Sequence, residues 1–479
     1  MNIWKPTIGV LILAVSLLLG ACGKEAQAPS TLVSPPVDEE STTVISDDQL
    51  EDIVRRSYQY VAMYNVNNKF ALAQGGWNTV QADTRLKDHT MTDIARPNND
   101  TLYIFSLLDL RKDPVILDVP SFDSTYVSLM VTAYDHYVNV PLSVTKGDFS
   151  TQEKVLFYSS RTEGYAGEKV EGVTRYYETS GDFVSAAFRV MPHANDPVRF
   201  EKITQQMKLV NVETLSEFQG KPAKAGDGLD LPNVGQTDSD VYENNFLEVM
   251  QFVVNHTSFD PANELDQKFL AAMKLVGVEP GKAYTKDSAV AIDGQRFRAA
   301  ADKVRQHEFA RTQDPTETEK FGLSLFQPKG EMELHLLVLQ SVIGPVGLPA
   351  SEAVYPPIVT TDGQPINALH DYVIHMSKDE LPPAKAFWSI TLYDSVNGFF
   401  IPNDHKKYSV GENAGMKLDS DGGLDIYISA EKPDGVPEEN WLPINRQDER
   451  LDVIMRIYDP DLEKYKIYAI PKAQVINSK

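Results

Sequence analysis

The chain holds a single cysteine, Cys22, among its 479 residues. One thiol cannot form a disulfide within the chain, so the fold depends on core packing alone. The sequence also lacks the Gly-x-Ser-x-Gly turn of serine hydrolases, the Gly-rich phosphate loop and the dinucleotide-binding fingerprint. These absences disfavour the serine-hydrolase, P-loop and Rossmann classes.

Basic residues are too few to balance the acidic ones. The chain has 45 Lys and Arg against 68 Asp and Glu, which gives a formal net charge of -23. Such a chain repels the phosphate backbone of nucleic acids, so we expect no nucleic-acid partner. We attribute the acidity to solubility rather than to ligand binding.

Signatures of metal sites are missing as well. No His-Glu-x-x-His occurs, and a spacing of five places His370 and His375 on opposite faces of an expected strand. A calcium loop beginning at Asp419 would need an acidic residue at its twelfth position, where Ala430 stands. We therefore expect the segment DSDGGLD to form a β-turn, and we predict no metal and no cofactor.

One apolar run, Ile8–Leu19, follows Lys5 near the start of the chain. Its length and flanking charge are typical of a secretory signal peptide, and it is short for a membrane span. It ends in LLGAC, which resembles the lipobox of bacterial lipoproteins. The resemblance implies cleavage before Cys22, a diacylglyceryl thioether on its sulfur and a further acyl chain on the new N-terminus. Gly23, where inner-membrane lipoproteins carry Asp, implies transfer to the outer membrane.

We therefore expect a signal peptide over residues 1–21 and a mature lipoprotein in the cell envelope, anchored at the outer membrane and facing the periplasm. Two or more acyl chains anchor a protein stably where one does not.

Residues 22–45 are rich in Pro, Ser, Thr and acidic residues and poor in large apolar ones. This composition predicts a flexible tether.

The rest of the chain divides by pattern into three parts. Residues 46–195 begin with helical spacing and continue as short alternating segments rich in Val, Tyr and Phe. They predict a leading helix followed by an N-terminal, antiparallel β-rich domain. Residues 196–345 return to helical spacing, with Pro197 at a first helical turn. Strand patterns resume in residues 346–479, so the expected fold class is α+β, with two β-rich domains joined by a mostly helical segment.

Several motifs resemble a known pair of domains. RPNNDTLYIFSLLDLRKDPVILDVP is similar to the core of domain of unknown function 1254. EAVYPPIVTTDGQPINALHDYVIHM, LPPAKAFWSITLYDSVNGFFIPND, DGGLDIYIS and ENWLPIN are similar to its usual C-terminal companion, domain of unknown function 1214. The resemblance implies two sandwich or jelly-roll-like domains with helices between them, and no settled activity. Where the family often has Arg-Tyr, this chain has Lys407 and Tyr408.

The motif RPNNDTLY places small polar side chains directly before an apolar strand, and two interpretations stay open. The side chains cap the strand end and satisfy loop amides, with Asp100 neutralising Arg96. Alternatively, they line a polar pocket. Pro97 favours an extended conformation for Arg96 in either case. The candidate ligand-binding residues from this motif are Arg96, Asn98, Asn99, Asp100, Thr101 and Tyr103.

Asp135 in the segment AYDHYVN is a further candidate. On a regular strand, Asp135 and Tyr137 share one face and His136 points to the other. Asp135 could not orient His136 in that arrangement, which weakens His136 as a general base.

Aromatic residues are frequent in the C-terminal part, and Tyr393 and Trp441 complete the candidate set. Such rings usually belong to a core. Rings beside polar groups also form pockets for small ligands such as sugars.

The missing catalytic signatures and the expected anchor favour an envelope protein that binds a small ligand or acts as an accessory factor. The alternative is a hydrolase or lyase that uses Arg96, Asp100, Tyr103 and Asp135, with a Tyr or Asp as acid or base. A purely structural envelope protein is the third hypothesis, so enzymatic activity stays open. The expected partners are the lipid anchor in its membrane and a small molecule.

Overall fold

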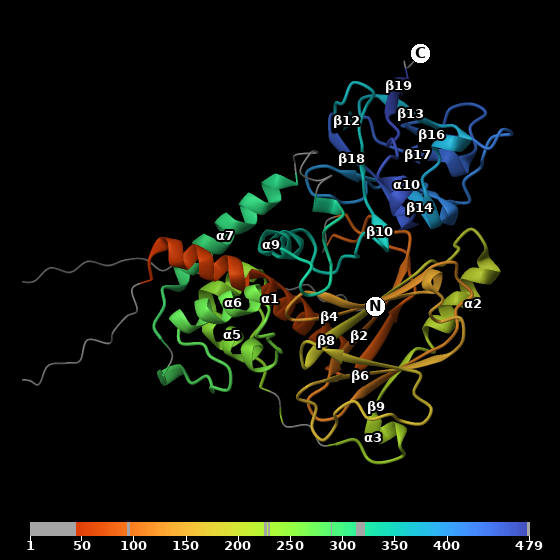
Figure 1. The fold of residues 1–479 in the computed structure, drawn as a ribbon. Coiled ribbons are helices and arrows are strands. Elements are labelled where there is room, and N and C mark those ends of the chain that lie inside the picture. The colour runs from red at the N-terminus through yellow and green to blue at the C-terminus, as the bar shows by residue number, and fades with distance from the viewer. Residues whose placement is uncertain are drawn as a thin grey trace, which may run out of the picture. The chain divides into compact units, whose positions relative to one another are not determined.

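Two pairs of β-sheets and one group of helices make up the part of the chain that the computed structural model describes (Figure 1). That part comprises residues 45–92, 96–224, 228, 230–288, 290–312 and 321–476. Cys22, the expected signal peptide and residues 22–44 of the expected tether lie outside the described residues. The mixture of helices and largely antiparallel sheets confirms the α+β class.

The first sandwich consists of nine strands in two sheets around an apolar core. The strands are β1 Thr79–Asp83, β2 Leu102–Asp109, β3 Val115–Val119, β4 Val127–Ala133, β5 Val138–Ser143, β6 Glu153–Ser159, β7 Arg175–Thr179, β8 Phe183–Val190 and β9 Asn211–Thr214. One sheet has the order β1-β2-β8-β4-β5 and the other β7-β6-β3-β9. Along β2 the side chains alternate, because Leu102 and Ile104 face the core while Tyr103 and Phe105 are only partly buried.

The second sandwich is built in the same way from the C-terminal strands. They are β10 Ala353–Val354, β11 Pro357–Ile358, β12 Ile366–Asn367, β13 Asp371–Met376, β14 Ala384–Asp394, β15 Ser409–Gly411, β16 Leu424–Ser429, β17 Trp441–Pro443, β18 Arg450–Pro460 and β19 Ala473–Ile476. One sheet has the order β10-β18-β14-β15, with β11 and β12 also on β18, and the other has the order β17-β16-β13-β19. The predicted turn at Asp419 is present, since the backbone N–H of Gly422 donates to its carbonyl at 2.9 Å.

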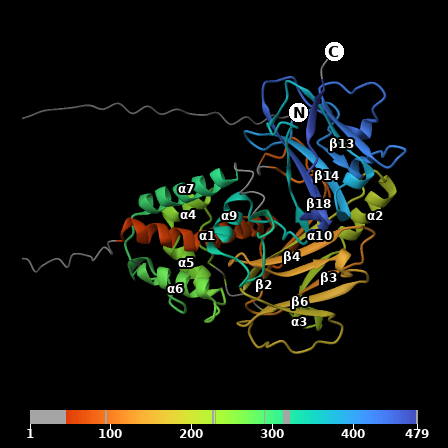
Figure 2. The ribbon, with the colours of Figure 1, turned by 45° about the horizontal axis from the view of Figure 1, so that its top comes forward.

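The helices gather mainly beside the first sandwich, with α1 at their centre (Figure 2). The α-helices are α1 Asp47–Gln74, α2 Pro197–Met207, α3 Leu215–Phe218, α4 Asp238–Asn244, α5 Phe246–Asn255, α6 Glu264–Leu275, α7 Gly294–Arg311, α9 Leu334–Ile343 and α10 Leu462–Tyr465. Short 3-10 turns are η1 Val144–Lys146, η2 Lys286–Ser288, η3 Lys378–Glu380, η4 Glu412–Ala414 and η5 Glu438–Asn440. Within the described residues, no helix is long and apolar enough to cross a membrane.

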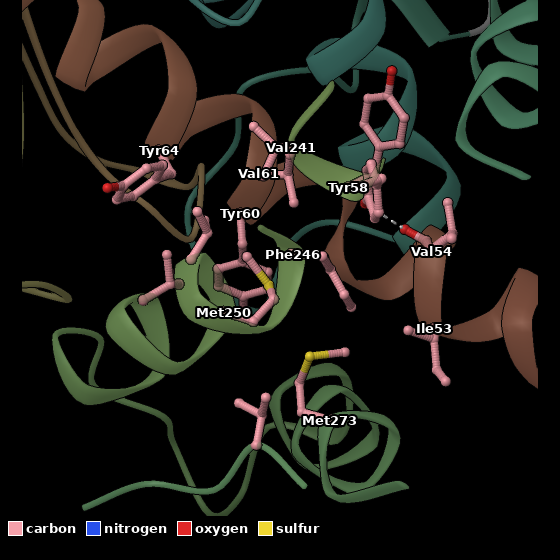
Figure 3. Close-up of a cluster of buried hydrophobic side chains, with 14 of the residues drawn as sticks. Ile53, Val54, Tyr58, Tyr60, Val61, Tyr64, Val241, Phe246, Met250 and Met273 are labelled. Atoms are coloured by element: carbon pink, nitrogen blue, oxygen red, sulfur yellow. Dashed lines mark hydrogen bonds between the residues drawn. The ribbon is translucent and has the colours of Figure 1, made fainter. Parts of the chain in front are cut away.

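Helix α1 forms because its sequence supplies both a start signal and a continuous apolar face. Ser46 caps it by a reciprocal pair of hydrogen bonds with Gln49, and Gly75 ends it in a left-handed conformation with a φ of 90°. The predicted apolar positions are buried and meet α4, α5 and α6 in one cluster (Figure 3). The Tyr60 ring stacks on Phe269 of α6 with centroids 4.1 Å apart, and Tyr64 lies 5.5 Å from Tyr134 in the turn after β4. Helix α1 thereby joins the helical group to the first sandwich.

Two elements within residues 196–345 pack with the first sandwich rather than with the helical group. Ile203 and Met207 of α2 enter the core of that sandwich. Strand β9 pairs with β3 at the edge of its second sheet. The chain therefore completes the first sandwich before it enters α4.

A further apolar cluster holds the two sandwiches and α9 together. It contains Tyr126 from the first sandwich, Leu337 from α9, and Phe387 and Tyr458 from the second sandwich. The Phe387 and Tyr458 rings stack with centroids 4.2 Å apart. Burial of these apolar side chains favours the contact between the sandwiches, and Tyr458 of the cluster also bonds the polar motif.

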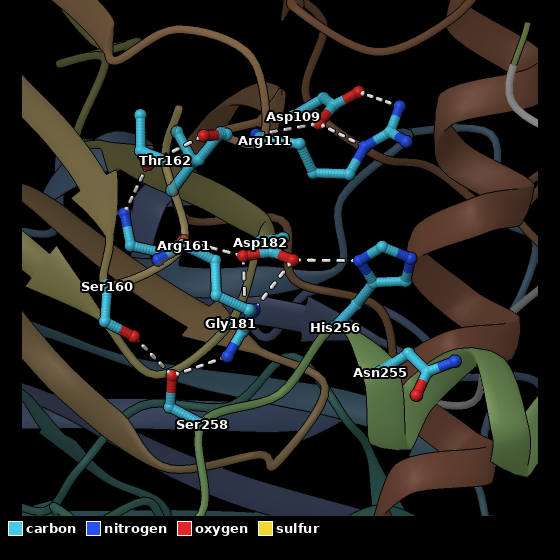
Figure 4. Close-up of polar contacts among 12 residues, drawn as sticks. Asp109, Arg111, Ser160, Arg161, Thr162, Gly181, Asp182, Asn255, His256 and Ser258 are labelled. Carbon is cyan, nitrogen blue, oxygen red and sulfur yellow. Dashed lines mark hydrogen bonds and ion pairs between the residues drawn. The ribbon is translucent and has the colours of Figure 1, made fainter. Parts of the chain in front are cut away.

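A buried polar cluster fastens the first sandwich to the end of α5 (Figure 4). Asp182 lies just before β8, and its carboxylate accepts hydrogen bonds from Ser159 Oγ at 2.6 Å and Arg161 Nε at 3.1 Å. His256, directly after α5, places Nδ1 2.8 Å from the same carboxylate. Burial alone would raise the pKa of Asp182, but these partners hold it below its usual value.

We expect the Asp182→Asn substitution to lower the free energy of unfolding by about 3–5 kcal/mol, because it leaves Arg161 and His256 without their shared anion. Urea denaturation followed by circular dichroism measures this. Since the pKa of Asp182 is depressed on folding, its contribution is complete above the unfolded value near 4 and is lost as the pH falls further. The exposed Asp434→Asn is the matched control, and equal unfolding midpoints for the two variants would refute the assignment.

Candidate functional site

Residues 96–101 of the RPNNDTLY motif lie against the second sandwich, just before β2 enters the first. The backbone N–H of Arg96 donates to the carbonyl of Gly398 at 2.6 Å. The side-chain amide of Asn413 donates to the carbonyl of Asp100 at 2.6 Å. Both partners follow β14 in the second sandwich, so the motif forms a junction between the two sandwiches.

Asn98 folds the motif into a local turn. Its side-chain oxygen accepts from the backbone N–H groups of Asp100 at 2.7 Å and Thr101 at 3.2 Å. Its side-chain nitrogen donates to the hydroxyl of Thr101 at 3.2 Å and to that of Tyr458 at 2.9 Å. Asn98 and Thr101 therefore serve the turn and the strand start, and Asn98 also ties them to β18.

The carboxyl of Asp100 is buried at the same junction. Ser389 of β14 donates to it at 2.7 Å and Tyr458 of β18 at 3.2 Å. Burial raises the pKa of Asp100 despite these bonds and the nearby Arg456. A carboxyl held in this way is a structural anchor between the sandwiches.

Two expectations for Arg96 were wrong. Its guanidinium does not pair with Asp100, because it donates to Asp452 of β18, with Nε 3.0 Å from Oδ2. Its backbone is not extended, since φ is 52°, a left-handed conformation that non-glycine residues seldom adopt. The ion pair and the backbone bond to Gly398 hold Arg96 in that conformation.

Tyr393 belongs to the same buried network and is not a free ligand platform. Its hydroxyl donates to the carbonyl of Pro97 at 2.7 Å and accepts from the guanidinium of Arg456. Arg456 also donates to the carbonyl of Arg96 at 3.1 Å. Side chains of β14 and β18 thus hold the backbone of the motif by hydrogen bonds.

Tyr103 lies on the outer face of the first sandwich. It pairs in register with Arg189 of β8, whose guanidinium carbon lies 5.5 Å from the centre of the Tyr103 ring. The ring runs parallel to that of Phe105, with centroids 5.7 Å apart. Tyr103 is not among the residues that line the pocket described next.

Asn99 points to a pocket of about 360 Å³ between the two sandwiches. Its side-chain nitrogen donates to the carbonyl of Lys87 at 3.1 Å, and its oxygen accepts from the hydroxyl of Ser409 at 2.6 Å. We call this space the Lys407 pocket. Its lining residues are Leu86, Asn99, His405, Lys406, Lys407, Tyr408, Ser409, Asn413, Ala414, Glu438 and Glu439.

The Lys407 amine is half-buried and donates to the backbone carbonyl of Glu438. Burial lowers its pKa to about 8. The acidic side chains of the pocket have other partners, because Glu438 lies 3.3 Å from His405 and Glu439 lies 3.6 Å from Lys417. Among the described residues, no carboxylate forms an ion pair with Lys407.

Trp441 lies behind the Lys407 pocket rather than on its surface. Its indole N–H donates to the carbonyl of Ser429 at 3.0 Å, and the His405 ring covers it at a centroid distance of 4.7 Å. It is only 3% exposed, so it offers no open face for stacking a sugar ring.

Asp135 lies at the opposite end of the first sandwich from the motif. Strands β2 and β4 both pair antiparallel with β8, and Leu102 and Val127 both pair with Val190. Their first residues are therefore at one end, with Asp100 preceding β2 there. Asp135 follows the last residue of β4, on the order of 20 Å away by strand rise. The four residues expected for a hydrolase or lyase do not form one site.

The Asp135 carboxylate instead takes part in a buried ion cluster. The Lys329 amine lies 3.1 Å from it and 2.9 Å from the carboxylate of Asp266 in α6. The side chain of Gln59 in α1 donates to the Asp135 carbonyl at 3.0 Å. These contacts tie the turn after β4 to the helical group.

The segment AYDHYVN is not a continuous strand, which corrects the assumption made for His136. β4 ends at Ala133, β5 begins at Val138, and His136 has a φ of 66° in the turn between them. Its Nε2 bonds the carbonyl of Pro345 at 2.8 Å, and its Nδ1 bonds the hydroxyl of Ser341 at 2.8 Å. Both ring nitrogens are occupied, so His136 is not available as a general base.

Comparison with family models identifies both halves of this junction. Residues 49–211 match the model described as protein of unknown function DUF1254. Residues 352–462 match the model described as protein of unknown function DUF1214. The chain belongs to the DUF1254–DUF1214 family. No curated protein matches the chain.

Solved structures show the same fold for a relative of this DUF1254–DUF1214 protein. The VPA0106 protein from Vibrio parahaemolyticus superposes with a TM-score of 0.68 at 24% identity, covering 90% of this chain and 100% of that one. A putative uncharacterised protein from Burkholderia cenocepacia matches with a TM-score of 0.41 at 10% identity, over 90% of this chain and 93% of that one. The first similarity extends the shared fold across both domains.

Several residues of the DUF1254–DUF1214 junction were missed by sequence reasoning. Arg189 and Arg456 each stand inside an apolar strand, in FVSAAFRVM and LDVIMRIYD, where a charged side chain is unusual. An arginine within an otherwise apolar strand was the feature of the sequence that indicated a buried polar site. Asn413 carries no such signal, because its role depends on where the motif loop lies in space.

We expect His136 to contribute about 3 kcal/mol to the fall in the free energy of unfolding as the pH drops from 6.5 to 4. Burial lowers the pKa of His136 from 6.5 to about 4, so the unfolded chain takes up this proton first. In His136→Gln this fall should be smaller in urea titrations at several pH values. His375→Gln is the control, because the Asp425 carboxylate raises the pKa of that exposed ring. An unchanged slope in His136→Gln would contradict the assignment.

Proposed function

We propose that this DUF1254–DUF1214 protein is a lipid-anchored envelope protein that binds a small, polar, anionic ligand in the Lys407 pocket. The observation that carries this proposal is a 360 Å³ pocket between two domains, lined by two lysines whose amines pair with no carboxylate among the described residues. The volume is within the range of small-molecule sites.

Residues of both domains contribute to the Lys407 pocket. Leu86 and Asn99 come from the DUF1254 domain, and the other lining residues come from the DUF1214 domain. The Asn99 carboxamide is held by Lys87 and Ser409, so its orientation is set before a ligand arrives. A ligand that contacts both domains would strengthen their junction, which supports binding with a gain in thermal stability.

The Lys407 amine favours a ligand that carries an anionic group and hydroxyl groups. Because Lys407 has a pKa of about 8, its amine is mostly protonated at neutral pH although it is half-buried. An anionic group beside it would supply a direct ion pair, while Asn99, Tyr408 and Ser409 offer hydrogen bonds to neighbouring hydroxyls. Binding of an anion would raise the pKa of Lys407, so affinity should decline above pH 8.

The envelope location rests on the N-terminal sequence. The apolar run before LLGAC and the lone Cys22 fit a lipoprotein signal, and the Pro-, Ser- and Thr-rich segment that follows fits a tether. An anchored domain on a tether reaches small solutes near the membrane, which agrees with a role in ligand capture.

We expect gluconate or glucose 6-phosphate to raise the melting temperature, and neutral glucose to have little effect, because the pocket needs an anion. Lys407→Met should weaken binding by about ten-fold or more, whereas Lys432→Met, at an exposed lysine outside the pocket, should leave it unchanged. Differential scanning fluorimetry and isothermal titration calorimetry at pH 7 and pH 9 measure both effects. Equal affinities of the two variants for these anions would refute the pocket assignment.

We expect the mature protein from cells to lack residues 1–21 and to carry acyl chains on Cys22, as measured by mass spectrometry. Cys22→Ser should leave the protein unlipidated and shift it from the membrane fraction to the soluble fraction. A mature wild-type species with an unmodified thiol would contradict the anchor without affecting the ligand proposal.

A further inference from the structure

Two buried arginines lie beside the motif, and neither of them lines the Lys407 pocket. Arg189 in β8 is 4% exposed and Arg456 in β18 is 6% exposed. One belongs to the DUF1254 domain and the other to the DUF1214 domain. Buried guanidinium groups are costly unless their N–H groups are bonded and their charge is balanced.

Neither guanidinium has all its N–H groups bonded. Arg189 donates from Nη2 to the carbonyl of Val346 at 2.6 Å, but its Nη1 is buried with no partner among the described residues. Arg456 donates from Nη2 to Arg96 and Tyr393, while its Nε is likewise without a partner there. Each arginine thus holds an unused donor in a buried position.

The two arginines face tyrosine rings more than carboxylates. The guanidinium carbon of Arg456 lies 5.4 Å from the centre of the Tyr355 ring, and that of Arg189 lies 5.5 Å from the centre of the Tyr103 ring. Both arginines lie within electrostatic range of Tyr355 and Tyr458, which places them in one cluster. Asp100 supplies one carboxylate, so the cluster of two arginines has about one positive charge in excess.

Tyr355 is the most exposed residue of this cluster. The residue is 38% exposed although its ring contacts the buried Arg456, and Tyr103 and Phe105 are also partly exposed. The Tyr103 and Phe105 rings lie parallel, with 3° between their planes. A flat molecule that enters here meets aromatic faces before it meets the guanidinium groups.

We infer that Arg189 and Arg456 bind the carboxylate of a small aromatic acid whose ring packs beside Tyr103 and Tyr355. A monocarboxylate would use the unused donors at Arg189 Nη1 and Arg456 Nε and would balance the single excess charge. A phosphate dianion would exceed that charge. This site is separate from the Lys407 pocket and does not depend on it.

Benzoate is the probe, and benzamide is its neutral counterpart of the same shape. We expect benzoate to bind in isothermal titration calorimetry and to raise the melting temperature, with benzamide and inorganic phosphate at least about ten-fold weaker. Equal affinities for benzoate and benzamide would overturn the inference, because the carboxylate would then make no specific contact.

Arg189→Lys and Arg456→Lys keep the charge but remove the planar fork, so each should weaken benzoate binding by about ten-fold or more. Tyr355→Ala removes an exposed ring with little risk to folding and should weaken it by about five-fold. Lys407→Met should leave benzoate affinity unchanged, which separates this site from the proposed pocket. If Tyr355→Ala binds benzoate as the wild type does, or if Lys407→Met alone loses it, the inference fails.

Discussion

The buried polar groups of one short loop must find hydrogen-bond partners, and those partners lie on the other domain. Asn98 and Asp100 reach Ser389 and Tyr458, which are some 300 residues further along the chain. An unbonded amide or carboxyl at this depth would cost several kcal/mol, so the native loop requires both sandwiches in place. The DUF1254 and DUF1214 domains are therefore coupled through the motif.

The loop contacts two places with different chemistry. Asn99 faces the Lys407 pocket, where lysine amines and hydroxyls suit a hydrated anion. Asp100 and Tyr103 lie on the side of Arg189 and Arg456, where aromatic rings suit a flatter acid. Each place holds a half-buried or buried basic side chain in a chain whose net charge is -23. At physiological salt such local charges act over less than about 10 Å, so the acidic surface does not prevent anion binding.

Much of the fold could be predicted because its signals are local. The apolar spacing predicted α1, and alternating Val, Tyr and Phe predicted the strands of both sandwiches. β9 and the hairpin at Asp135 were missed, since β9 has only four residues and the AYDHYVN segment carries strand-like residues through a turn. In each case a tertiary contact overrode the local pattern.

The sequence by itself determined the α+β class, the order of the two domains and the importance of the RPNNDTLY motif for the strand that follows. Only the tertiary structure decided which residues share a site. It separated Asp135 from Asp100, placed Trp441 behind a pocket, paired Arg96 with Asp452 and brought Arg189 to Arg456. The physical reason is that periodicity records which face of an element is buried, whereas the partner of a buried polar group depends on packing between distant elements.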